Sequence, residues 1–167
     1  MRTVDPFLAE LEHEAVTTRR LLEHVPEEKY TWRPHERAFS LGELAWHVAG
    51  IPGSMAELLS GESFDMGNPP DSFESAASKT QLLAEADEST GKAQAWLNSL
   101  DEEAAAFPWR LMKGNQELMT IPRAAAIRSF MFNHLYHHRG QLSTYLRIAG
   151  ERVPSVYGPT ADENPFE

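Results

Sequence analysis

Apolar side chains recur along most of this chain at intervals of three or four residues, which is the period of an α-helix with one buried face. The first such stretch covers residues 5–25, with Pro6 at the early helical position that tolerates proline best. The second covers residues 40–61, where Ser40 and Glu43 have the spacing of a capping box. The pattern therefore predicts two helices in the first part of the chain.

The later part of the chain has the same period with one interruption. A third helix is predicted over residues 78–100 and a last one over residues 122–150. Between them, residues 107–122 form two short apolar arms around Gly114, which is typical of a β-hairpin. The connection 61–75 is rich in Gly, Pro, Ser and Asp, and it predicts a long surface loop.

Four helices with one apolar face each can bury those faces against one another. The pattern therefore predicts an all-α fold, an up-and-down-type four-helix bundle with a short β-hairpin before the last helix. We expect a single domain over residues 1–167, with the proline-containing tail 151–167 lying over the surface as an extended arm.

Composition narrows the classes of function. The 167 residues include no cysteine, which excludes a disulfide framework, a thiolate metal site and a cysteine nucleophile. Acidic residues outnumber basic ones by 25 to 15, and a net charge of −10 repels nucleic acid and anionic lipid. The chain also begins without a signal-peptide pattern and has no apolar stretch long enough to span a bilayer. We expect a cytoplasmic protein with no nucleic-acid or membrane partner.

Three histidines are the candidate chemistry. His134 and His138 are four residues apart on the predicted core stripe of the last helix, so their side chains share one face and can bind one metal ion. His47 lies on the apolar face of the second helix and is the natural third ligand. Three protein ligands with one open position are typical of a catalytic metal site. A single histidine on an apolar face, such as His47 taken alone, is more often a core side chain satisfied by a hydrogen bond.

Other residues near this motif have different expected roles. His137 points about 100° away from His138 around the helix and should be exposed or lie behind the ligands. No glutamate follows His134, so the general base of an HExxH protease is missing. Gln141 could orient an imidazole, whereas we expect Arg139 to face outward and take no part in catalysis.

At these residues the chain resembles the DinB/YfiT-like superfamily over nearly its whole length. Residues 32–50 are similar to the second-helix region of that superfamily, with its metal histidine at His47. Residues 134–147 are similar to its last-helix motif, where His134 and His138 match the other two ligands.

The resemblance implies a four-helix bundle that holds one divalent ion, often nickel or zinc, and that is frequently a homodimer. Some members are transferases that use low-molecular-weight thiols such as bacillithiol or mycothiol, and others are metal-dependent hydrolases. We therefore expect a metal-dependent enzyme, first a thiol-dependent S-transferase acting on a small-molecule substrate. A metal-dependent hydrolase and a non-catalytic metal-binding stress-response protein are the alternatives.

Overall fold

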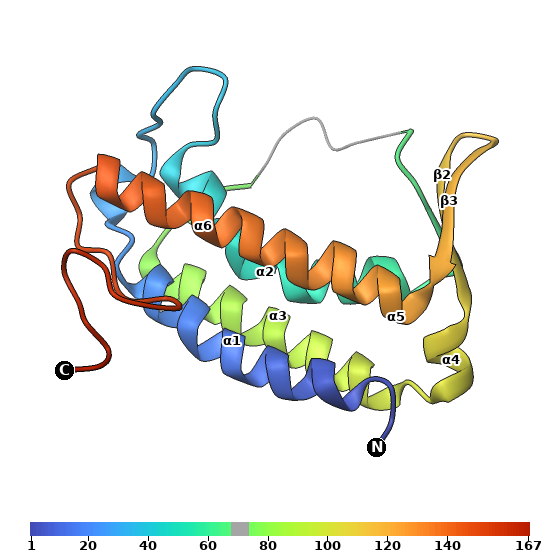
Figure 1. The fold of residues 1–167 in the computed structure, drawn as a ribbon. Coiled ribbons are helices and arrows are strands. Elements are labelled where there is room, and N and C mark those ends of the chain that lie inside the picture. Colours follow the sequence, from blue (N-terminus) through green and yellow to red (C-terminus); the bar gives the residue numbers. More distant parts are fainter. Residues whose placement is uncertain (68–73) are drawn as a thin grey trace.

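The computed structural model describes residues 1–67 and 74–167, which form a mostly helical protein with a small three-stranded sheet (Figure 1). Its long helices lie side by side and are α1 (Asp5–Glu23), α2 (Leu41–Ser60), α3 (Lys79–Ser99) and α6 (Asn133–Ile148). The shorter helical segments are the 3-10 turn η1 (Glu27–Lys29), α4 (Glu102–Ala106), α5 (Arg123–Ala126) and the π-helical segment η2 (Ile127–Phe132).

The directions of the long helices differ from the predicted up-and-down arrangement. Helices α2 and α3 run in the same direction, and both are antiparallel to α1 and α6 (Figure 1). The start of α3 lies at the end of α1, where Lys79 Nζ donates to the carbonyl of Glu23 at 2.9 Å. At the opposite end, Arg2 Nη1 donates to the carbonyl of Asn98 at 2.9 Å. The predicted up-and-down order is therefore wrong. The connection from the end of α2 to the start of α3 is long because the chain must go back along a helix that is about 30 Å long.

The start of α2 has the local structure that its sequence predicts. Ser40 Oγ accepts from the Glu43 backbone N–H at 3.2 Å, and Glu43 Oε2 accepts from the Ser40 N–H at 2.6 Å, so the predicted capping box is confirmed. The helix continues through Pro52. At Gly53 an added Cβ would lie 2.9 Å from Ser89 Cα, and the Gly53 N–H donates to Ser89 Oγ at 2.8 Å. This glycine lets the parallel helices α2 and α3 approach closely.

The predicted hairpin is confirmed and gains a third strand. Strands β2 (Pro108–Lys113) and β3 (Gln116–Pro122) are antiparallel, and Gly114 has a φ of 57° in the turn between them. Strand β1 (Ser63–Asp65), from the connection predicted as a loop, pairs with β2 in parallel and gives the order β1-β2-β3. Residues 68–73 of that connection lie outside the described part of the chain.

The buried face of α6 differs from the predicted one. Its buried residues are Leu135, Arg139, Leu142 and Leu146, whereas the predicted stripe passed through the histidines. The expectation that Arg139 faces outward is wrong, because its side chain is 1 % exposed. It forms an ion pair with Glu14 and donates to Thr18 Oγ1 at 3.0 Å. The histidines consequently lie at the edge of the core, half-buried.

The tail after α6 contains no helix or strand and lies beside the ends of α1 and α6 (Figure 1), as predicted. Glu163 holds it in place by accepting from Arg20 Nη2 at 2.5 Å. Within the described residues, none of the helices combines the length and the apolar character needed to cross a membrane.

Candidate metal centre

Three histidine side chains meet between α2 and α6. His47 comes from α2, and His134 and His138 come from the beginning of α6. One ring nitrogen from each can be chosen so that all three atoms lie within 4.8 Å of one another. His47 Nε2 and His134 Nε2 are 3.1 Å apart, although 87 positions separate the two residues in sequence. The structure thus brings together all three residues that the sequence predicted.

The donor set fits a divalent ion. Imidazole nitrogens bind zinc at about 2.0–2.1 Å, so two of them on one tetrahedral or octahedral ion are about 3 Å apart. The 3.1 Å between His47 Nε2 and His134 Nε2 agrees with that separation. The three-histidine group contains no carboxylate and no thiolate, which suits zinc, nickel, copper or iron better than magnesium or calcium. The three residues could therefore hold a metal ion.

The surroundings keep these rings neutral, which is the form that can bind a metal. Burial lowers the pKa of His47 to about 4, assisted by repulsion from His138 and His134. Burial also lowers the pKa of His134 to about 4, with a further contribution from His138. The pKa of His138 is lowered as well, chiefly by burial.

Two neighbours fix the orientation of the rings. His138 Nδ1 lies 2.8 Å from Gln141 Oε1, so a proton on Nδ1 leaves the Nε2 lone pair available for a metal. This contact confirms the predicted position of Gln141. The ring of Phe39 stacks on His47 with centroids 5.8 Å apart, and its centroid is 6.1 Å from that of His138. Phe39 was not predicted from the sequence. The one feature that could have indicated its role is its position directly before the N-cap Ser40.

Two cavities border the histidines. A cavity of about 550 Å³ is lined by His138 and Gln141, with Arg33, Arg37 and Tyr145 among its other walls. A second cavity, of about 300 Å³, shares no lining residue with the first and is lined by His47 and by residues that include Trp46, Glu57 and Glu85. A small molecule bound in either cavity would contact one of the three histidines, His138 in the first or His47 in the second.

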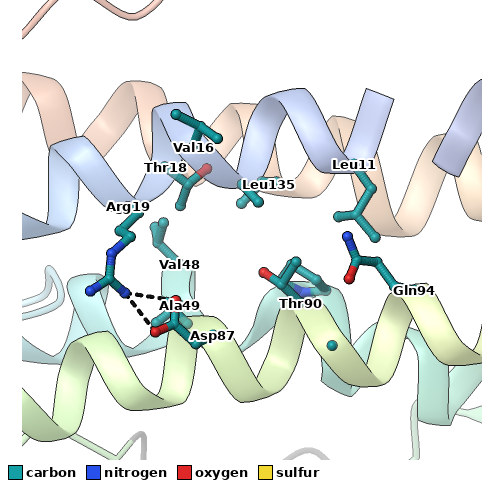
Figure 2. A pocket seen from close by; sticks show the side chains of 14 residues that line it. Leu11, Val16, Thr18, Arg19, Val48, Ala49, Asp87, Thr90, Gln94 and Leu135 are labelled. Atoms are coloured by element: carbon teal, nitrogen blue, oxygen red, sulfur yellow. Dashed lines mark hydrogen bonds and ion pairs between the residues drawn. The ribbon is translucent and has the colours of Figure 1, made fainter. Parts of the chain in front are cut away.

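Other candidate groups lie elsewhere. His137 is exposed, as predicted, and so are His13 and His35. In the chain outside residues 68–73, His47, His134 and His138 form the only group of three or more histidine, cysteine or acidic side chains close enough to share an ion. A third cavity, shown in Figure 2, is lined by none of these histidines.

Comparison with known proteins connects this arrangement to a family. The profile of the DinB family matches residues 1–165. The chain belongs to the DinB family. A curated relative, the uncharacterized protein YrdA of Bacillus subtilis, is 29% identical over 165 residues, covering 97% of this chain and 92% of YrdA.

Solved structures of DinB-like proteins share the fold. A DinB-like protein of Bacillus cereus has a TM-score of 0.67 at 21% identity, over 90% of this chain and 95% of that one. The DinB-like protein YjoA of Bacillus subtilis has the same TM-score and identity, over 96% and 100%. A member from Exiguobacterium sibiricum has a TM-score of 0.61 at 20% identity, over 97% and 98%. The helical fold is therefore that of DinB-like proteins.

Proposed function

We propose that this DinB-family protein is a metal-dependent enzyme in which His47, His134 and His138 hold one divalent ion, either zinc or nickel. The observation that carries the proposal is the convergence of three ring nitrogens at the border of two cavities. An ion with three protein ligands keeps a position open to a further molecule. In this proposal the four long helices form a four-helix bundle, and two facing helices of the bundle hold the metal-binding histidines in place.

The reaction we propose first is S-transfer from a low-molecular-weight thiol to a small electrophilic substrate. The sulfur–carbon bond forms as the bond to the leaving group breaks, and the leaving group departs with the thiol proton. A bound divalent ion supplies the activation, because it lowers the pKa of a thiol or a water molecule beside it. The cavity of about 550 Å³ at His138 has the size of a small-molecule site.

The residues around the histidines have supporting roles. Gln141 holds His138 in one orientation, and Phe39 covers one face of His47. Tyr145 and the Arg33 side chain line the cavity where the substrate would lie. Two acidic side chains, Glu36 and Glu43, also line this cavity, and Glu43 already accepts from the Ser40 N–H.

A second candidate reaction, hydrolysis, is favoured by the cavity of about 300 Å³ at His47. Glu57 and Glu85 line that cavity together with His47, and Glu85 is half-buried. A carboxylate in this position could accept the proton of an attacking water molecule. Both reactions take a small molecule as substrate. We further propose that the protein acts as a homodimer without nucleic-acid or membrane partners.

One pair of assays separates these reactions. Zinc-loaded and nickel-loaded protein is given 1-chloro-2,4-dinitrobenzene with a small thiol, and separately p-nitrophenyl acetate without thiol. S-transfer that is lost in His134→Ala and kept in the exposed control His137→Ala supports the transferase. Ester hydrolysis that is lost in His134→Ala and in Glu85→Gln supports the hydrolase. Activity in neither assay, with the metal bound, would favour a non-catalytic metal-binding protein.

A further inference from the structure

A cavity of about 260 Å³ lies between α1 and α3, on a different set of residues from the three histidines (Figure 2). Its apolar lining comes from all four long helices, with Leu11 on α1, Val48 on α2, Ala86 on α3 and Leu135 on α6. The cavity therefore opens at the surface between α1 and α3 and extends to buried side chains of the helical core.

Small side chains create this space. Ala15 on α1 and Ala86 on α3 line it, and Gly91 lies at its edge with nothing within 4 Å of the position where a Cβ would be. An ion pair holds α1 and α3 together beside the cavity, because Arg19 Nη1 contacts Asp87 Oδ1 at 2.6 Å (Figure 2). The ion pair thus fixes the distance between α1 and α3, and the small residues between the two helices leave space unfilled.

One part of the cavity wall is polar. Thr90 and Gln94 extend from α3 into the space between the two helices (Figure 2). Among residues 1–67 and 74–167, neither the Thr90 hydroxyl nor the Gln94 amide has a hydrogen-bond partner in another side chain or backbone group. These groups are therefore available to a ligand. The charged wall residues, Arg19 and Asp87, are already paired with each other.

We propose that this cavity is a second binding site, which takes one small neutral molecule with an aromatic or branched alkyl body and a single hydrogen-bonding group. The apolar body is buried among Leu11, Val48 and Leu135, and the polar group is bound by the Gln94 amide. A charged ligand is disfavoured, because the two charged wall residues are already paired with each other and the apolar lining does not replace the ligand's hydration. The volume is near the lower end of the range for ligand pockets, so the molecule is about the size of benzyl alcohol.

The test is a titration of the full chain with three probes of matched shape, namely benzyl alcohol, toluene and benzoate, followed by NMR chemical shifts. We expect benzyl alcohol to bind saturably at one site per chain, toluene more weakly, and benzoate not at all. Shifts should centre on residues of the cavity, including Ala86 and Leu135. Equal binding of benzoate and benzyl alcohol, or shifts that never saturate, would overturn the proposal.

Two variants and a control sharpen the result. Gly91→Leu places a side chain at the cavity edge in open space, and it replaces a poor helix former, so the protein should remain folded. It should weaken benzyl alcohol binding at least tenfold. Gly140→Leu makes the same change in α6, also in open space and away from the cavity, and should bind as wild type does.

The polar end has its own variant. Gln94→Leu should lower benzyl alcohol affinity to that of toluene and leave toluene unchanged. Full benzyl alcohol affinity in both Gly91→Leu and Gln94→Leu would place the binding elsewhere and refute the assignment. None of these results bears on the metal centre, because no histidine lines this cavity.

Discussion

Arg139 and Glu14 form an ion pair inside the protein, with side chains that are 1% and 7% exposed. The pair joins α6 to α1, and the hydroxyl of Tyr157 in the tail also contacts both side chains. A charge at this depth is stable only with a partner, because burial removes its hydration. The pair therefore ties together two helices and the tail that follows them.

Removing one member of this pair should destabilise the protein strongly. Arg139→Ala leaves the Glu14 carboxylate buried without its partner, and we expect the free energy of unfolding to fall by about 3–5 kcal/mol. Urea denaturation measures this change. The matched control is Arg147→Ala, which breaks an ion pair with Asp162 at the surface and should cost less than about 1 kcal/mol. Equal losses in the two variants would show that the buried pair is not a structural tie.

Two glycines in neighbouring helices should respond to alanine in opposite directions. In Gly53→Ala the new Cβ would lie 2.9 Å from Ser89 Cα, so α2 and α3 must separate. We expect a loss of about 1–3 kcal/mol from this overpacking. In Gly91→Ala the Cβ meets open space, and helix propensity should add about 0.5–1 kcal/mol. Thermal unfolding measures the change in stability of both variants. A stabilised Gly53→Ala would contradict the close approach of α2 and α3 at Gly53.

Stability below about pH 4.5 should depend on Glu10. A hydrogen bond from Arg128 lowers the pKa of this carboxyl below its ordinary value of 4.5, and Tyr136 adds to the effect. The unfolded chain then binds more protons than the folded one as pH falls through this region. The stabilisation is complete above the ordinary pKa and is lost as pH drops. Glu10→Gln should therefore flatten the dependence of unfolding free energy on pH between about 5 and about 3, and an unchanged slope would contradict this assignment.

Gln141 should affect metal affinity without being a ligand. Gln141→Leu removes the oxygen 2.8 Å from His138 Nδ1, so the ring loses its preferred orientation. We expect metal affinity to fall about 10–100-fold, as for other groups that orient metal-binding histidines. Gln141→Glu keeps an acceptor in place and should bind metal nearly as tightly as wild type. Competition with a chromophoric chelator gives the affinities, and identical values for Gln141→Leu and wild type would remove Gln141 from the site.

The sequence predicted the parts of the fold that depend on near neighbours. The Ser40–Glu43 capping box and the turn at Gly114 are encoded within a few residues, and both are present. The three histidines were also found from spacing and apolar context. The pairing of β1 with β2 joins segments far apart in the chain, so no local pattern indicated it.

The error at Arg139 has a specific cause. A regular helical period carried forward from Ile127 passes through His134 and His138, but η2 makes wider π-helical turns over Ile127–Phe132. The buried face therefore continues one position later, at Leu135 and Arg139. Local sequence also assigns an arginine in that stripe to the surface, because its partner Glu14 is 125 positions away in the chain.

The central claim, that the three histidines hold one metal ion, is tested most directly by elemental analysis. The protein is purified without a histidine tag or added metal, beside His47→Ala, His134→Ala, His138→Ala and the exposed control His137→Ala. We predict close to one zinc or nickel ion per chain in the wild type and in His137→Ala, and its loss in the other three variants. Absence of metal from the wild type with no uptake on titration, or equal metal in all five proteins, would contradict the claim.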